Sequence, residues 1–161
     1  MGLLSFVREA GEKLFGRKDV EAAAAESAQD KLADLNQKAA AAIVAYIDKQ
    51  GLDTRALQVS FDGASSTVTV AGTVADQATR EKVLLCCGNV EGVDKVDDQL
   101  TVINPEPPAT FHTVVRGDTL SAIAKACYGN ANAYMKIFEA NKPMLSDPNK
   151  IYPGQVLRIP A

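Results

Sequence analysis

A proline-rich stretch at residues 104–109 divides the chain into two parts of unequal length. Its three prolines lack the amide N–H that a β-ladder needs, and each one restricts the backbone of the residue before it. Regular structure cannot run through such a segment, so we expect a stiff linker over residues 104–110. The flanking regions, 27–103 and 111–161, are then candidate folding modules, preceded by an N-terminal segment over residues 1–26.

The longer module begins with a helical pattern. Between residues 27 and 49 apolar side chains recur at spacings of three and four, which predicts a helix with one buried stripe, and Gly51 can end it. A hairpin is expected next. Apolar and polar residues alternate over 57–61, the Asp-Gly pair at 62–63 favours a turn, and a β-branched run follows at 68–74.

A second helix and a last strand complete this module. The carboxylate of Asp76 can cap a helix that runs through Cys87, and Gly88 suits the left-handed residue just past its end. Apolar residues over 93–102 then predict a strand. The sum is an αββαβ unit whose three short strands need two helices to cover one face.

The shorter module is predicted to be a βααβ unit. Its expected elements are a strand at 111–115, a helix from about 118 to 127, a helix at 130–140 and a strand at 156–159. Asp118 or Thr119 can cap the first helix, and Pro153-Gly154 can turn the chain into the last strand. Both modules mix helices and strands, so the predicted fold class is α+β.

Charge and apolar patterning exclude several kinds of protein. The net charge is −3 and no Lys/Arg cluster is present, which argues against binding to nucleic acid. No apolar run approaches the roughly 20 residues that span a bilayer, and charged residues interrupt the N-terminus where a secretory signal would be apolar. We therefore expect a cytoplasmic monomer. Cys86, Cys87 and Cys127 lack a disulfide or metal spacing and read as small buried hydrophobes in a reducing compartment.

Catalytic constellations are not recognisable in the sequence. His112 is the only histidine, and its place in a strand favours a solvent-facing residue. Asp97 and Asp98 are adjacent in a strand, so their side chains point to opposite faces and do not form a carboxylate pair. Calcium-loop, phosphate-loop and GxSxG signatures are missing. We expect a protein that is not an enzyme.

Residues 111–142, FHTVVRGDTLSAIAKACYGNANAYMKIFEANK, and 151–160, IYPGQVLRIP, resemble a complete LysM domain. In that family a shallow groove between the loop after the first strand and the loop before the last strand binds N-acetylglucosamine-containing chains. The matching positions are Gly117, Asp118, Thr119, Leu120, Ile151 and Pro153. An alternative is that these residues only build the fold, since no Trp is present to stack on a sugar ring.

Residues 27–103 resemble a BON domain, with VTVAGTV at 68–74 and GNVEGVDKVDDQL at 88–100. The order of MGLLSFVREAGEKLFG, a BON unit and a LysM unit resembles the bacterial cytoplasmic potassium-binding BON–LysM family. An Ala-rich insert around residues 20–28 is the main departure from that pattern. The resemblance implies that K⁺ is the ligand.

Two segments of the chain could supply carbonyl oxygens to one such ion. Potassium is well served by several neutral carbonyl oxygens, which are left without partners at helix C-termini and at glycine-rich bends. The first segment is the turn at 88–93. The second is the N-terminal amphipathic segment, whose carbonyls could close the cage around the ion. It is interrupted at Gly11 and has a broad apolar side formed by Leu3, Leu4, Phe6, Val7, Ala10 and Leu14. The family resemblance implies that the ligands are the backbone carbonyls of Val7, Ala10, Glu12, Gly88, Val90 and Val93.

Three functional hypotheses follow. The leading one is a non-enzymatic potassium sensor or buffer that becomes compact when K⁺ binds. The alternative is a cell-envelope protein that binds peptidoglycan or N-acetylglucosamine through its LysM unit. A scaffold that uses LysM to contact another protein is compatible with either. On residues alone, the turn at 88–93 could equally be a helix C-cap, with an N-terminal helix covering an apolar face.

Overall fold

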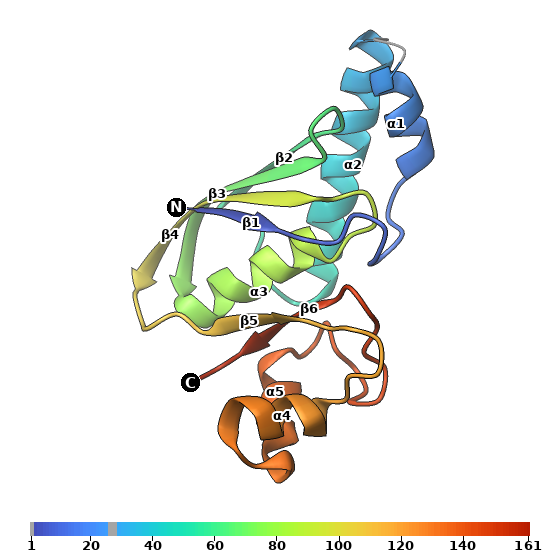
Figure 1. Cartoon of the computed structure of the whole chain (residues 1–161). Coiled ribbons are helices and arrows are strands. Elements are labelled where there is room, and N and C mark those ends of the chain that lie inside the picture. The colour runs from blue at the N-terminus through green and yellow to red at the C-terminus, as the bar shows by residue number, and fades with distance from the viewer. Residues whose placement is uncertain (1, 26–28) are drawn as a thin grey trace.

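A computed structural model describes residues 2–25 and 29–161. It shows a four-stranded sheet with helices packed against it, and below it a smaller unit built on a two-stranded sheet (Figure 1). The elements are β1 (Gly2–Ser5), α1 (Arg17–Ala25), α2 (Gln29–Lys49), β2 (Leu57–Asp62), β3 (Thr67–Asp76), α3 (Gln77–Gly88), β4 (Lys95–Asn104), β5 (Thr110–Thr113), α4 (Leu120–Tyr128), η1 (Ala131–Ala133), α5 (Tyr134–Ala140) and β6 (Val156–Ile159).

The large sheet has the strand order β1-β4-β3-β2. β2 and β3 form the predicted antiparallel hairpin, β3 and β4 are parallel, and α3 is the connection between them. The αββαβ prediction is confirmed in this part. β1 is an additional strand, antiparallel to β4, with Leu4 opposite Val96.

The helical stripe predicted in the first helix lies in the core. Ala39, Ile43 and Ile47 of α2 are fully buried and pack with Val68 and Val70 of β3. Burial alternates along β3 from Thr67 onward, so one face of the sheet is covered and the other is only partly exposed. The structure begins this helix at Gln29, and the predicted start at Ser27 lies outside the described residues.

Helix α3 begins as predicted, but it ends differently. The Asp76 side chain accepts a hydrogen bond from Thr79 N at 2.7 Å, so the predicted N-cap is confirmed. Gly88 is the last helical residue, with Asn89 as the C-cap, and it does not have a positive φ angle. The prediction for Gly88 is therefore wrong. A Cβ there would collide with the ring of Phe6, so glycine is needed for close packing.

The N-terminal segment is a strand and a loop where an amphipathic helix was the alternative. Apolar residues at 3, 4, 6 and 7 fit a helix face as well as a strand, and the edge of β4 offers backbone partners that local sequence does not reveal. Leu3 and Val7 are exposed, whereas Phe6 is buried. Part of the Ala-rich insert lies in α1, which packs on α2 and buries Val20 and Ala23.

The C-terminal unit has the predicted βααβ order, with η1 preceding α5. Thr119, not Asp118, is the N-cap of α4, because its hydroxyl accepts from Ala122 N at 3.1 Å. A separate core, which includes Leu120, Ile123, Ile137 and Leu157, fills this unit. Cys86 and Cys87 are buried as expected, but Cys127 is exposed, which corrects the prediction for that residue.

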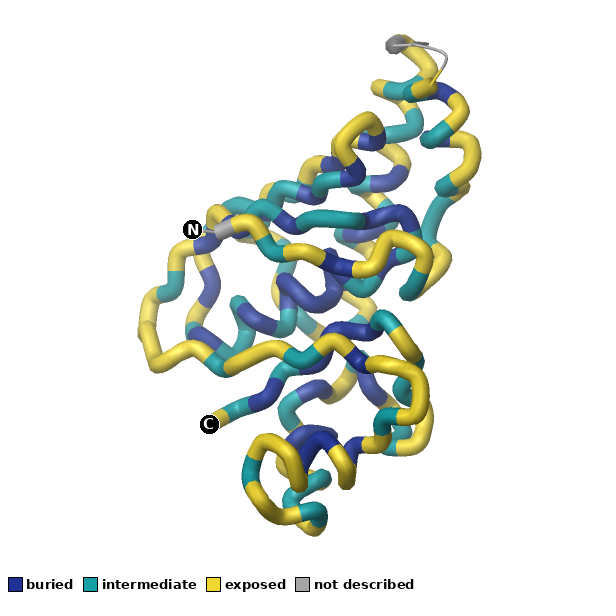
Figure 2. The backbone as a smooth tube through the Cα atoms, in the orientation of Figure 1, coloured by how far each residue is buried: buried dark blue, intermediate teal, exposed yellow. Residues whose placement is uncertain are grey.

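The two units contact each other through α3. This helix is buried on several sides because the sheet covers one side and β6 approaches another (Figure 2). Its Glu81 carboxylate accepts from Ala109 N at 3.1 Å and lies 3.4 Å from Arg158 Nε, which fixes the end of the proline-rich linker. None of the helices in the described part of the chain has the length and apolarity that crossing a bilayer requires.

Candidate functional site

The two segments singled out from the sequence lie side by side. We call residues 6–12 the N-terminal loop and residues 88–94 the α3–β4 bend. Four backbone hydrogen bonds join them: Phe6 N to Asp94 O at 2.8 Å, Gly92 N to Arg8 O at 2.7 Å, Glu12 N to Asn89 O at 2.9 Å and Glu91 N to Glu12 O at 2.8 Å. The chain thus brings together two stretches that are about 80 residues apart.

Gly11 allows this close approach, and Gly92 allows the residues that follow the loop to pack on the bend. Gly11 has φ +116°, and a Cβ on it would lie 2.5 Å from Asn89 O. Gly92 has φ +102°, and a Cβ there would lie 3.2 Å from the ring of Phe15. Residues with a side chain rarely adopt such φ angles, and a Cβ at either position would crowd its neighbours. Both positions therefore require glycine.

Three of the six predicted carbonyls already accept amides. Val7 O accepts from Ala10 N at 3.1 Å, Val90 O from Val93 N at 3.1 Å, and Glu12 O from Glu91 N at 2.8 Å. The expectation that the ligand carbonyls are free of partners is wrong for these three. Each carbonyl oxygen has a second lone pair and can still face a cation.

The other three carbonyls belong to Ala10, Gly88 and Val93. Within residues 2–25 and 29–161, none of these three oxygens accepts a hydrogen bond. Gly88 and Val93 are buried, so their oxygens have little access to bulk water. Buried, unpaired carbonyls on two touching segments are the donor set that a weakly hydrated cation can use.

The surroundings are apolar on one side and polar on the other. Phe6, Val90 and Val93 are buried in the core. On the other side, Glu12 and Asn89 line a cavity of about 250 Å³ between the two units, together with Leu85, Tyr46, Met144, Leu145, Ser146, Lys150, Tyr152 and Gln155. Burial and the nearby Glu12 carboxylate raise the pKa of Tyr152 to about 12.

Asn89 connects the bend to the C-terminal unit. Its Nδ2 donates to Val156 O at 2.9 Å, and its Oδ1 accepts from Val156 N at 2.9 Å. One side chain therefore satisfies both backbone groups of a β6 residue, as a neighbouring strand would. Sequence reasoning missed this role, because Asn at a helix C-terminus is common for purely local reasons.

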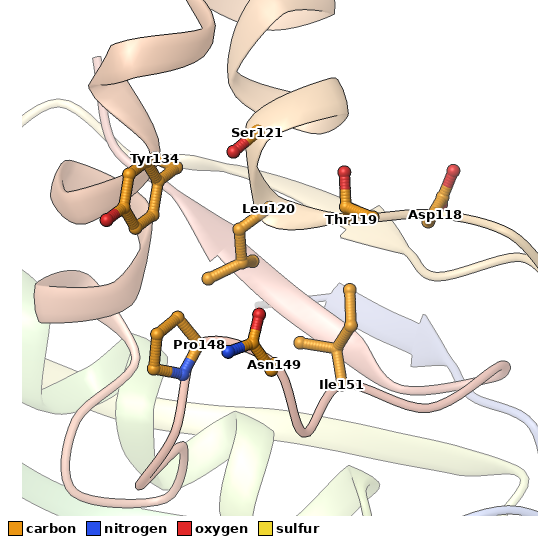
Figure 3. Close-up of a pocket in the computed structure, with 8 residues that line it drawn as sticks. All are labelled: Asp118, Thr119, Leu120, Ser121, Tyr134, Pro148, Asn149 and Ile151. Atoms are coloured by element: carbon orange, nitrogen blue, oxygen red, sulfur yellow. The ribbon is translucent and has the colours of Figure 1, made fainter.

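A second cavity of about 370 Å³ lies in the C-terminal unit (Figure 3). Four of the predicted groove residues, Asp118, Thr119, Leu120 and Ile151, line it, whereas Gly117 and Pro153 do not. Tyr134 also lines this groove and was not predicted, because its position at the start of a helix did not show which way the ring faces. The groove has an aromatic ring although the chain has no Trp.

The single histidine has a structural contact. His112 Nε2 lies 2.8 Å from Asp118 Oδ2, and the same carboxylate accepts from Val115 N at 3.0 Å, which closes the turn after β5. These two bonds hold the pKa of Asp118 below its usual value, with the backbone bond contributing most. The prediction that His112 faces solvent is only partly confirmed, since its side chain is 34% exposed and hydrogen-bonded.

The adjacent aspartates point apart as predicted. Asp98 is buried and binds Arg80 Nε at 2.9 Å, whereas Asp97 accepts from Gln99 at 2.9 Å. Across the described residues, no group of three or more His, Cys, Asp or Glu side chains is arranged to hold a metal ion.

Comparison with known proteins agrees with this division of the chain. The BON domain family matches residues 32–104, and the LysM domain family matches residues 112–160. The potassium binding protein Kbp of Escherichia coli O6:H1 is 46% identical over 160 residues, which cover 99% of each chain.

Two other relatives match only about a third of this chain. An uncharacterized protein of Deinococcus radiodurans is 49% identical over 51 residues, 32% of this chain and 19% of its own length. An esterase of Mycobacterium tuberculosis is 49% identical over 53 residues, 33% of this chain and 11% of its own. Both similarities are too short to carry an activity across. The full-length match decides the matter, and the chain belongs to the family of BON- and LysM-domain proteins that includes Kbp.

Proposed function

We propose that this protein is a non-enzymatic potassium-binding protein, a sensor or buffer, and that the ion lies between the N-terminal loop and the α3–β4 bend. Its ligands are the backbone carbonyls of Val7, Ala10, Glu12, Gly88, Val90 and Val93. The observation that carries the proposal is the direct backbone pairing of these two segments, at glycines whose φ angles no other residue readily adopts.

Family membership supports the choice of ion. The relative that matches over the full length is named for potassium binding, and MGLLSFVREAGEKLFG at the N-terminus of this chain forms one of the two proposed halves of the site. Carbonyl dipoles without a net charge suit a large, weakly hydrated monovalent ion. Sodium is smaller and loses its hydration shell less readily, so we expect it to bind more weakly.

Ion binding also accounts for the buried, unpaired oxygens. The carbonyls of Gly88 and Val93 are removed from water without a protein donor, which is unfavourable unless another partner is present. A cation between the segments supplies that partner. The proposed ion therefore stabilises the packed arrangement of loop and bend, and the protein becomes more compact when the ion binds.

Calorimetric titration and thermal unfolding of the full chain test this proposal. Potassium, sodium and choline chloride are compared at equal ionic strength. At 100 times Kd, potassium raises Tm by about 5–10 °C relative to choline, and sodium raises it less. Equal melting temperatures in potassium and choline, with no heat of potassium binding, would reject the proposed function.

The LysM groove supports a second candidate function, which is binding of N-acetylglucosamine-containing glycans. Tyr134 and Ile151 give the groove an apolar surface of the kind on which a sugar ring packs, and Asn149 adds a polar group. Addition of chitin oligomers to the labelled protein should shift the amide signals of residues 118–121 and 148–151. A spectrum unchanged at millimolar oligomer would discard this function and leave the potassium proposal intact.

A further inference from the structure

Arg17 lies across the α3–β4 bend. It is the first residue of α1, and its Cγ lies 3.1 Å from the position that a Cβ on Gly92 would occupy. The ring of Phe15 lies 3.2 Å from the same Cβ position. The Arg17 side chain is only 20% exposed, so its aliphatic part forms the outer cover of the bend.

The guanidinium of Arg17 contacts carboxylates from three different segments. Its Nη1 lies 3.8 Å from Glu9 in the N-terminal loop and 3.6 Å from Glu21 in α1, and its Nε lies 3.6 Å from Glu91 in the bend. The loop and the bend carry all six proposed ligands. Arg17 is therefore a cation shared by both halves of the proposed site and by the helix between them.

Such a shared contact differs from an ordinary surface ion pair. Isolated exposed pairs contribute little, because water screens them and long side chains lose freedom. Here one largely buried cation contacts three carboxylates. The more exposed Arg8 also contacts Glu9 and Glu21, so Arg17 is the cation that connects them to Glu91 of the bend. Its Nε is buried and has no hydrogen-bond partner, so the surrounding contacts, and not a local bond, set its position.

We propose that Arg17 is a positioning residue for the potassium site: it holds the N-terminal loop and the α3–β4 bend in register, so that their carbonyls converge, without itself touching the ion. This inference rests on the proposed function. It assigns a role to a residue outside both segments, at the first position of α1.

Electrostatics alone predicts the opposite effect. A guanidinium close to the site repels a second cation, so its removal should strengthen potassium binding if Arg17 acts only through its charge. If Arg17 positions the segments, its removal should weaken binding, because the ionic contact that ties Glu91 of the bend to α1 and to the N-terminal loop is then lost. The sign of the change in Kd separates the two roles.

Calorimetric titration with potassium chloride tests the inference on the full chain. Arg17→Met keeps the aliphatic cover over Gly92 and removes the charge, and we expect it to raise Kd about tenfold. Arg17→Lys keeps the charge but not the planar fork that reaches three partners, so its Kd should lie between those of Arg17→Met and the wild type. The control is Arg55→Gln, which removes an exposed pair with Asp53 away from the site and should leave Kd unchanged.

Melting in choline chloride separates positioning from general stability. The expected result is a loss of potassium affinity that is larger than the loss of stability measured without potassium. An Arg17→Met protein that binds potassium as tightly as the wild type, or more tightly, overturns the inference. If Arg17→Met does not fold in choline, Arg17→Lys decides, and a wild-type Kd for that variant overturns it. Absence of potassium binding by the wild type is a different result, which rejects the proposed function itself.

Discussion

Glycines around the proposed ion site and glycines in two turns of the LysM unit have positive φ angles for different reasons. A Cβ on Gly117 or Gly129 would meet no atom within 4 Å, so these residues are needed only for the turn and for the left-handed C-cap of α4. A Cβ on Gly11 or Gly92 would press on another segment. Gly117 and Gly129 each shape one segment, whereas the glycines around the proposed ion site let two segments touch. Gly154 of the LysM unit belongs to the second group, because a Cβ on it would lie 2.7 Å from Ala10 Cβ in the N-terminal loop.

The difference matters for the kind of site each region can form. Open turns place side chains around a groove that solvent and a ligand can reach, as at Thr119 and Ile151. Backbones in contact place carbonyl oxygens close together and away from water, which suits a desolvated ion. The two regions therefore fit two classes of ligand, and substitutions can test the distinction.

The largest expected effect is that of Gly11→Ala. The new Cβ would lie 2.5 Å from Asn89 O at a φ of +116°, so the N-terminal loop has to move away from the bend. We expect a loss of about 2–4 kcal/mol in the free energy of unfolding, and potassium binding too weak to detect by calorimetry.

Gly117→Ala is the matched control for this change. It meets similar φ strain at +95° but no steric contact, so it should cost about 1–2 kcal/mol and leave potassium affinity unchanged. Equal potassium affinities for the two variants would show that the contact between loop and bend has no part in ion binding.

The two asparagines that bind β6 provide a second comparison. Asn89 forms two hydrogen bonds with Val156 from the α3–β4 bend. Asn141 binds β6 from within the LysM unit, accepting from Arg158 N at 2.8 Å and donating to Arg158 O at 2.8 Å. Alanine at either position should cost about 2 kcal/mol in thermal unfolding.

Of the two variants, only Asn89→Ala should also weaken potassium binding, because Asn89 joins the proposed site to the LysM unit and Asn141 does not. Asn141→Ala should lower the stability of the LysM unit and leave Kd for potassium within about twofold of the wild type. Similar losses of affinity in the two variants would mean that LysM stability in general, and not the contact at Asn89, supports the site.

The smallest expected effect concerns the helix caps of the two regions. Asp76 caps α3, and backbone and side-chain hydrogen bonds to Thr79 lower its pKa below 3.8. A lowered folded-state pKa adds stability above the unfolded-state pKa, and that stability is lost as the pH falls through the folded value. Asp76→Ala should therefore cost about 1 kcal/mol at pH 7 and progressively less below about pH 4.

Thr119 caps α4 with a hydroxyl that does not titrate in this range. Thr119→Ala should therefore lower the free energy of unfolding by about the same amount at pH 7 and at pH 3. Urea unfolding at pH 7 and pH 3 measures both differences. A cost of Asp76→Ala that does not change with pH would contradict the assigned capping bond.

The sequence was most informative where structure depends on neighbours along the chain. Local patterns predicted the buried stripe of α2, the β2–β3 hairpin and the N-cap at Asp76. They also predicted the βααβ order of elements in the LysM unit. Four of the six proposed groove residues also line the cavity in the LysM unit. Local spacing is sufficient to predict these residues, because the groove lies between two turns and each turn is formed by residues that are adjacent in the sequence.

Features that depend on distant segments could not be predicted in this way. The strand at Gly2–Ser5 forms because β4 leaves an edge free, and Gly88 is required because Phe6 packs on it. The Asn89 contact with Val156 depends on how the two units dock. In each case the partner lies more than 60 residues away, where periodicity and turn signals carry no information.

The most direct test of the ion site is an anomalous-scattering measurement on crystals in which rubidium replaces potassium. The account predicts one strong peak between the N-terminal loop and the α3–β4 bend, surrounded by the backbone oxygens of residues 7–12 and 88–93. A peak held by carboxylates elsewhere, or none between these two segments in crystals of a protein that binds rubidium in solution, would contradict it.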